Sequence, residues 1–160
     1  MDVTADELAG VVDLFGGLTR AELSRALAEL AYRQGEEYDT DAYDRRIDDA
    51  LQSYHLVRFD DDAVETDGEL LCSGPLAFPA LPPDARDLPH ILDVEARELD
   101  TGALGERVAD RFRQDACDAI DTADDERIET LLDTSYELEA WASVDLTAVR
   151  DELAESTPTN

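Results

Sequence analysis

The side chains that could bind a soft metal are few and widely spaced. A structural zinc site uses four cysteine or histidine ligands, usually in closely spaced pairs. The chain offers only two histidines and two cysteines, with no such spacing: His55, Cys72, His90 and Cys117. The acidic runs 60–62 and 124–126 lack the alternating ligands and the glycine of a calcium loop. The sequence therefore predicts no metal site and no cofactor.

Nucleophilic catalysis requires a serine, cysteine or threonine that is exposed beside a base. The chain has no GxSxG motif, no GxGxxG fingerprint and no phosphate-binding loop. A dyad of Cys117 with His90 remains open, but Cys117 lies in a segment of helical periodicity where core packing explains it more simply. An acid–base pair also remains open, although acids are so abundant that no pair stands out. We expect two core cysteines and no enzymatic activity.

One predicted helix carries arginines that could contact DNA. Apolar residues at 43, 47, 50, 51 and 54 recur at intervals of three and four, which predicts a helix that begins near Asp39 or Thr40. Its outer face and the strand that follows it supply the candidate DNA contacts, which are Arg45, Arg46, Gln52 and Arg58. In the alternative that we favour, the helix arginines pair with aspartates one turn away: Asp41, Asp48 and Asp49.

Residues 75–99 contain five prolines interleaved with apolar residues. Proline disfavours a helix and a central strand, and a free linker would not need the apolar residues, so we predict an extended strap that lies on the globule. Phe78 and Leu81 in this strap, together with Trp141 further on, are candidate contacts with a protein partner. Ordinary core packing is the alternative for Trp141.

Two capping boxes predict where the first helices begin. Thr4 with Glu7 and Thr19 with Glu22 have the spacing in which side chain and backbone cap each other. The first helix should end at the glycines 16–17, the second near Gly35. A hairpin of strands 56–59 and 69–72 should follow the third helix, with turns at 60–62 and 67–68. Over residues 1–74 this order of elements resembles a winged helix-turn-helix, although the connection 32–40 is longer than its simplest turn.

The last third is predicted to be helical. A long helix should begin after Asp100 or Thr101, and a short one should cover 126–132. An irregular or weakly helical stretch with Tyr136 and Trp141 should follow, before a final helix capped near Asp145. The residues 156–160 should be disordered.

Acidic residues far outnumber basic ones. The 41 Asp and Glu residues against 13 basic residues give a formal net charge of −28, and every basic residue is arginine. In dilute buffer, repulsion among these carboxylates would destabilise the compact state. In molar salt the Debye length is only about 3 Å, so most of this repulsion is screened. The composition therefore predicts adaptation to concentrated salt. It neither supports nor excludes DNA binding, because such salt weakens the repulsion between an acidic chain and DNA but also removes most of the counterion-release gain that drives phosphate binding.

The start of the chain is acidic and shows no secretory signal, and no apolar run approaches the ~20 residues of a membrane span. We therefore expect a soluble cytoplasmic protein. Three stretches resemble an uncharacterised haloarchaeal family: TADELAGVVDLFG at 4–16, LPHILD at 88–93 and YELEAW at 136–141. This resemblance covers nearly the whole chain and implies a cytosolic, salt-adapted setting, but it supplies no catalytic residue.

Together these patterns predict a mainly α protein. A winged-helix-like three-helix core with a β-hairpin should occupy residues 1–74, the proline-rich strap 75–99, a C-terminal helical subdomain 100–155, and a disordered tail 156–160. The expected function is a non-catalytic regulatory or protein-interaction module whose partner is another protein. The alternative is a DNA-binding transcriptional regulator that uses the third helix.

Overall fold

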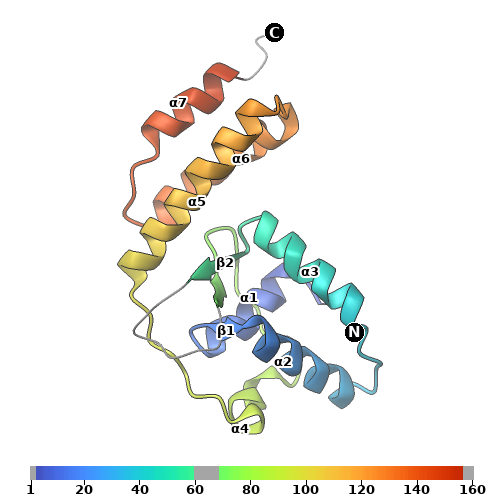
Figure 1. Cartoon of the computed structure of the whole chain (residues 1–160). Coiled ribbons are helices and arrows are strands. Elements are labelled where there is room, and N and C mark those ends of the chain that lie inside the picture. The colour runs from blue at the N-terminus through green and yellow to red at the C-terminus, as the bar shows by residue number, and fades with distance from the viewer. Residues whose placement is uncertain (1–2, 60–68, 157–160) are drawn as a thin grey trace. The chain divides into compact units, whose positions relative to one another are not determined.

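Helices dominate the computed structural model of the chain, as predicted (Figure 1). The structure describes residues 3–59 and 69–156, and within these ranges it has seven α-helices, one 3-10 helix and three short strands. The predicted turns at 60–62 and 67–68 and residues 157–160 of the predicted tail lie outside the described residues, whereas Ser156, which we assigned to the tail, is the last residue of a helix. The chain divides into two compact units, Met1–Leu99 and Asp100–Asn160, so the proline-rich strap belongs to unit 1.

The capping boxes position the first two helices of unit 1. α1 (Ala5–Leu14) begins after Thr4, and α2 (Arg20–Arg33) begins after Thr19. In each box the threonine side chain accepts the amide N–H of the glutamate three residues on, and that glutamate accepts the amide N–H of the threonine. Both predicted boxes are confirmed. α3 (Thr40–Gln52) begins after Asp39, which caps it, and its start agrees with the prediction of a helix that begins near Asp39 or Thr40.

The hairpin is present, and it gains a third strand that the sequence did not reveal. β2 (Leu56–Phe59) pairs antiparallel with β3 (Leu70–Ser73), with Leu56 opposite Ser73. β1 (Leu18–Thr19) lies between α1 and α2, where we predicted only a glycine corner, and it pairs antiparallel with β3. The sheet order is therefore β1-β3-β2. The central strand β3 pairs with β1, which precedes α2, and with β2, which follows α3.

A left-handed tyrosine ends α3 and directs the chain into the sheet. Tyr54 has φ 64°, and the amide N–H of His55 donates to the Ala50 carbonyl at 3.0 Å. Glycine is the usual residue at this position of a helix end. The Tyr54 ring is buried, and the Tyr54 carbonyl accepts the amide N–H of Leu76 at 3.1 Å, so side-chain burial and the start of the strap both hold this conformation.

The core of unit 1 is formed by the inner faces of its helices, by the sheet and by the strap. From the strap, Ala85, Leu88 and Leu92 are buried in the same cluster as the apolar stripes of α1, α2 and α3. Burial of apolar area of this kind is the main favourable term in folding. The strap is therefore part of the core of unit 1.

The strap contains helix, contrary to our prediction. A 3-10 turn, η1 (Ala85–Asp87), leads into α4 (Leu88–Leu92). Pro89 lies in the first turn of α4, where its missing N–H costs no helical hydrogen bond, so proline is tolerated there. The prediction treated every proline as a breaker and overlooked this position.

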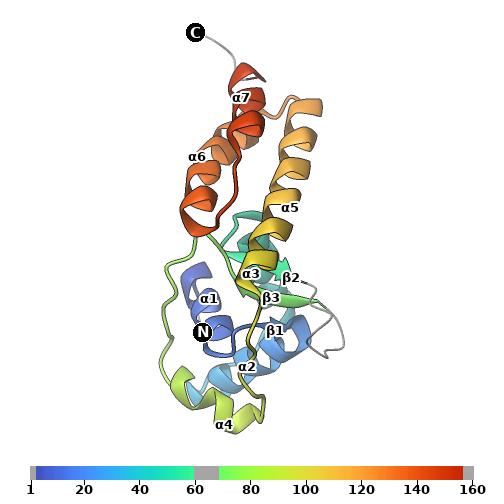
Figure 2. The same ribbon diagram turned by 90° about the vertical axis from the view of Figure 1, so that its left-hand side faces the viewer.

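The first part of the strap lies directly against α1 (Figure 2). The amide N–H of Ala80 donates to the Asp6 carbonyl at 3.0 Å, and the amide N–H of Phe78 donates to Asp6 Oδ1 at 3.0 Å. Gly10 permits this approach, because a Cβ at that position would lie 2.0 Å from the Ala80 carbonyl oxygen. The glycine in the middle of α1 thus marks where the strap docks.

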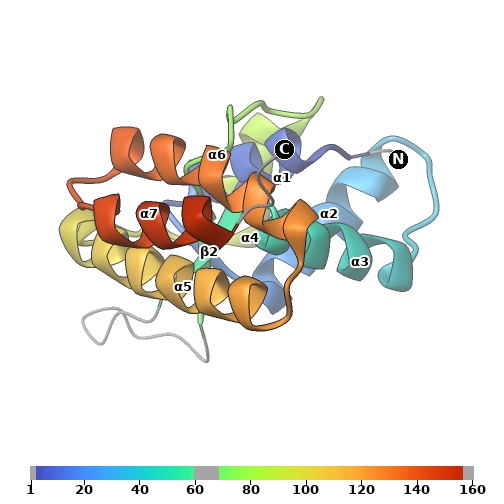
Figure 3. The ribbon, with the colours of Figure 1, turned by 90° about the horizontal axis from the view of Figure 1, so that it is seen from above.

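Unit 2 consists of three helices that pack side by side (Figure 3). α5 (Thr101–Asp121) begins after its predicted cap Asp100, and α7 (Thr147–Ser156) completes the unit. Between them, α6 (Asp125–Trp141) is one continuous helix. We had predicted a short helix over 126–132 and then an irregular or weakly helical stretch, and the helical alternative is the one that the structure has. Only the predicted break after 132 was wrong, because Leu131, Ser135 and Leu138 continue one buried face, and a serine in that face interrupted the apolar pattern.

No helix in the described part of the chain is long and apolar enough to cross a membrane.

Replacing Gly10 with alanine tests the docking of the strap. Alanine normally stabilises a helix interior by about 1 kcal/mol relative to glycine, but here its Cβ must displace the strap backbone. We predict that Gly10→Ala lowers the free energy of unfolding of unit 1 by roughly 1 kcal/mol or more, measured by calorimetry in molar KCl. Gly102→Ala on α5, where a Cβ meets only the Asp100 side chain at 3.4 Å, should cost nothing. Equal stability of Gly10→Ala and the wild type would contradict the close contact.

Candidate partner-binding site

Two large apolar side chains of the strap face solvent. Phe78 is 80% exposed and Leu81 is 40% exposed. Pro79, Ala80 and Pro83 are also exposed, whereas Pro82 is buried. We call residues 78–81 the strap edge. It is a continuous apolar stretch, and isolated exposed apolar residues are more usual on a protein surface than such runs.

The backbone of the strap edge is fixed although its side chains are exposed. Its two hydrogen bonds to Asp6 and the close contact at Gly10 hold the main chain on α1. A partner that covers Phe78 and Leu81 would therefore not have to order the backbone first. Preorganisation of this kind reduces the entropy cost of binding.

An arginine holds the other end of the strap. Arg97 Nη1 and Nη2 donate to the two carboxylate oxygens of Glu22 at 2.8 and 3.0 Å, and Nη1 also donates to the Gly17 carbonyl at 2.9 Å. Partial burial alone would raise the pKa of Glu22, but the hydrogen bond and charge of Arg97 and the amide of Thr19 lower it below its usual value. The ionised Glu22 carboxylate stabilises the folded state through these contacts at neutral pH. This stabilisation is lost as the pH falls through the lowered pKa of Glu22.

The sequence did not point to this ion pair. Glu22 was recognised only as part of a capping box, and Arg97 lies 75 positions away. The feature of the sequence that could have indicated a contact here is the glycine pair 16–17, because residues without a side chain leave room for the strap. A Cβ on Gly16, which has φ 77°, would lie 2.0 Å from the Arg97 carbonyl oxygen.

The two candidate DNA-binding arginines of α3 lie in different surroundings. Arg45 is exposed, and its Nε lies 3.4 Å from the Asp41 carbonyl oxygen. Arg46 is half-buried, and its Nη1 donates to the Val3 carbonyl at 2.6 Å. The prediction that both arginines lie on the exposed face was therefore wrong for Arg46, because its side chain reaches back to the segment that precedes α1.

Two aspartates of α3, Asp44 and Asp48, contact an arginine of the neighbouring helix α2. Arg20 on α2 lies 2.9 Å from Asp48 Oδ1 and 3.6 Å from Asp44 Oδ1, and it also donates to the Asp44 carbonyl. These contacts join α2 to α3. Gln52 and Arg58, the remaining candidate DNA contacts, are both exposed, on the last turn of α3 and on β2. The helix carries four aspartates and two arginines, so it offers few cationic groups to DNA phosphates.

Trp141, the third candidate partner contact, belongs to unit 2. It is half-buried at the last residue of α6. Phe78 and Leu81 are in unit 1, so only these two of the three candidate partner contacts lie in the same unit.

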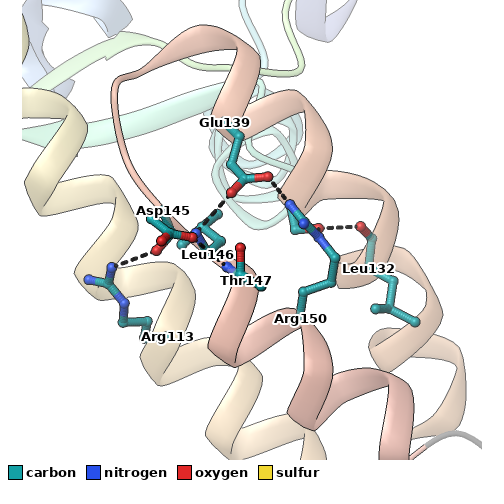
Figure 4. Close-up of polar contacts among 8 residues, drawn as sticks. Arg113, Leu132, Glu139, Asp145, Leu146, Thr147 and Arg150 are labelled. Carbon is teal, nitrogen blue, oxygen red and sulfur yellow. Dashed lines mark hydrogen bonds and ion pairs between the residues drawn. The ribbon is translucent and has the colours of Figure 1, made fainter.

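A polar cluster ties α6 to α7 in unit 2 (Figure 4). Glu139 accepts the amide N–H of Leu146 at 2.9 Å through one carboxylate oxygen and pairs with Arg150 through the other. Arg150 Nε donates to Ser135 Oγ at 2.9 Å, and its guanidinium lies 4.1 Å from the centre of the Tyr136 ring. At the start of α7, hydrogen bonds from Thr147 lower the pKa of the exposed Asp145, as expected for a carboxylate whose charged form accepts hydrogen bonds.

A serine, a histidine and an aspartate come together beneath the strap edge. Ser53 Oγ lies 2.7 Å from His55 Nδ1, and His55 Nε2 lies 4.0 Å from Asp6 Oδ1. Ser53 Oγ also donates to the Ala50 carbonyl, and Asp6 already accepts the amide N–H of Phe78. The trio lacks the close histidine–aspartate bond that orients a catalytic imidazole. Its hydrogen bonds instead hold the end of α3 and the strap.

The two cysteines differ in exposure. Cys72 is buried in β3, and burial raises the pKa of its thiol to about 12. Cys117 is exposed on α5, so our prediction of two core cysteines was wrong for Cys117. Its neighbour Ala116 faces the core, and one residue further along a helix is a turn of about 100°. Among the described residues, no group of three or more His, Cys, Asp or Glu side chains is arranged to hold a metal ion.

The chain belongs to a protein family without an assigned activity. A family model described as "Family of unknown function (DUF7109)" matches residues 6–158, which is nearly the whole chain. This confirms the expectation of an uncharacterised family. No curated protein and no solved structure matches the chain. Any function has therefore to be argued from the geometry of the chain itself.

The exposure of the two thiols predicts how they react. We expect one equivalent of a maleimide to modify native protein at Cys117 within minutes, and the second equivalent to react only after unfolding. Mass spectrometry of the labelled peptides measures both sites, and Cys117→Ser is the control. Rapid native labelling of Cys72 would contradict its placement in the sheet. Labelling of Cys117 follows from exposure alone and therefore gives no support to a thiol enzyme.

Proposed function

We propose that this member of the DUF7109 family is a non-catalytic regulatory module that binds another protein through the strap edge. The observation that carries the proposal is the 80% exposure of Phe78 on a backbone that is fixed to α1. Large aromatic side chains dominate the binding energy of many interfaces because they bury much area and lose little entropy. The partner we propose is a protein with an apolar pocket that receives Phe78 and Leu81.

The charge of the chain supports an apolar recognition surface. We propose that the protein works in the cytoplasm of a haloarchaeon, since its net charge of −28 and its exclusive use of arginine suit concentrated salt. Salt at molar concentration screens attraction between exposed charges as strongly as it screens repulsion. Burial of apolar surface does not depend on that screening, so Phe78 and Leu81 would remain effective contacts.

Unit 1 supports a winged-helix type of module. Its elements follow the order α1-β1-α2-α3-β2-β3, and the hairpin follows the third helix directly. The same scaffold supports DNA binding through α3 as the alternative function, with exposed Arg45 as its first contact. We favour the protein partner because Arg46 contacts the Val3 carbonyl and because aspartates outnumber arginines on α3.

The experiment compares the strap edge with a second site whose aromatic side chain, Tyr32, is as exposed as Phe78. Full-length tagged protein is used in molar KCl to isolate partners from an extract, and the affinity of each purified partner is then measured. We predict that Phe78→Ser with Leu81→Ser weakens binding at least tenfold, since truncating central apolar contacts costs about 2 kcal/mol or more. Tyr32→Ser removes an aromatic residue that is 81% exposed on α2, and it should leave the affinity unchanged.

Two outcomes would contradict the proposal. One is a partner whose affinity is the same for the wild type, the strap-edge variant and Tyr32→Ser. The other is a mobility shift of genomic DNA fragments in molar KCl that Arg45→Ala abolishes and the strap-edge variant does not, which would favour the DNA-binding alternative.

A further inference from the structure

The segment between α4 and unit 2 depends on one residue for its polar contacts. Residues 94–100 have no regular secondary structure, and Glu95, Ala96 and Glu98 are exposed. All the hydrogen bonds that the structure describes for residues 94–99 are made by Arg97. Its amide N–H donates to the Phe15 carbonyl at 2.7 Å, and its guanidinium contacts Gly17 and Glu22.

The contact between Arg97 and Glu22 has the geometry of a strong ion pair. Both carboxylate oxygens accept N–H groups of the same guanidinium, which is the bidentate arrangement that arginine favours. The side chains are only 16% and 19% exposed, so salt screens this pair less than it screens the exposed pairs. The contact therefore persists in the molar salt that weakens other surface ion pairs.

The chain on either side is anchored independently of this contact. Before it, Leu92 is buried in the core of unit 1. After it, the Asp100 side chain caps α5 in unit 2 by accepting the amide N–H of Ala103. Between these anchors, Val94 and Leu99 provide the apolar contacts, and both are only half-buried. A segment with so few buried contacts can open without the global unfolding of its unit.

We propose that the Arg97–Glu22 contact is a latch whose opening releases residues 93–99 from unit 1 while α1 and α2 stay folded. With the latch closed, the chain is held on unit 1 up to Leu99. With the latch open, these residues become a flexible tether between the units. When one unit has bound a partner, the length of free chain between the units sets the effective concentration of the other unit near that partner. Opening the latch lengthens the free chain, so the latch would regulate how a partner engages both units.

Glu22→Gln tests the latch while sparing the helix cap. Glutamine can occupy this position of a capping box, so α2 keeps its N-terminal contact and loses only the charge that holds Arg97. Amide hydrogen exchange of the full-length protein in molar KCl follows the Arg97 N–H together with the amides of α1 and α2. We predict about a tenfold loss of protection at Arg97, the size expected for losing a hydrogen bond to a charged group, with less than a twofold change in the two helices.

Two variants sharpen the measurement. Glu29→Gln is the matched control, because Glu29 lies on the same helix and pairs with Arg33 at an exposed site, so Arg97 should keep its protection. Arg97→Lys keeps the charge but cannot form the bidentate contact, so we expect a loss of protection intermediate between wild type and Glu22→Gln. Unchanged protection in Glu22→Gln would overturn the latch. So would an equal loss in α1 and α2, since the segment would then open only with the whole unit.

Discussion

The protein has to join helices that carry a large excess of negative charge, and its thirteen arginines are the only basic side chains that can do so. Several lie where two elements meet. Arg20 joins α2 to α3, and Arg46 joins α3 to the segment before α1. Arg97 joins the strap to α2, Arg127 on α6 approaches Asp115 on α5, and Arg150 joins α7 to α6. A guanidinium can bind a carboxylate and a backbone carbonyl at once, which suits it to such joints.

This use of arginine limits what the surface can offer a partner. The arginines that hold elements together are not available to contact phosphate, as Arg46 illustrates. α3 carries more acids than arginines, so it offers few cationic groups that could contact DNA phosphates. The strap edge differs, because Phe78 and Leu81 are uncharged and their backbone is fixed. The same strap thus closes the core through Leu88 and Leu92 and presents an apolar surface outside.

Local signals in the sequence were sufficient for the parts of the fold that depend on neighbouring residues. The capping boxes at Thr4 and Thr19 involve contacts three residues apart, so spacing alone predicted them. For the helices that begin after Asp39 and Asp100, the sequence narrowed each start to two adjacent residues. Strand β1 could not be predicted in this way. It has two residues, and it exists because β3, about fifty positions later in the chain, supplies its hydrogen bonds.

The candidate site was predictable in part. Phe78 and Leu81 were identified because apolar residues between prolines need a surface to contact, but sequence could not show which of them face outward. The latch was not predictable, since Arg97 and Glu22 are 75 positions apart and each has an ordinary local environment in sequence. Cys117 was assigned to the core because it follows Ala116, a buried residue, and a shift of one position along a helix changed its face.

The claim that most of the structure depends on is that the excess acids repel one another unless salt screens them, while the arginine joints hold the elements together. Thermal unfolding of the wild-type protein, followed by circular dichroism from about 0.1 M to molar KCl, tests it most directly, because the Debye length falls from ~10 Å to ~3 Å over that range. We predict that Tm rises steeply across it. A Tm that stays constant or falls as KCl increases would contradict the claim.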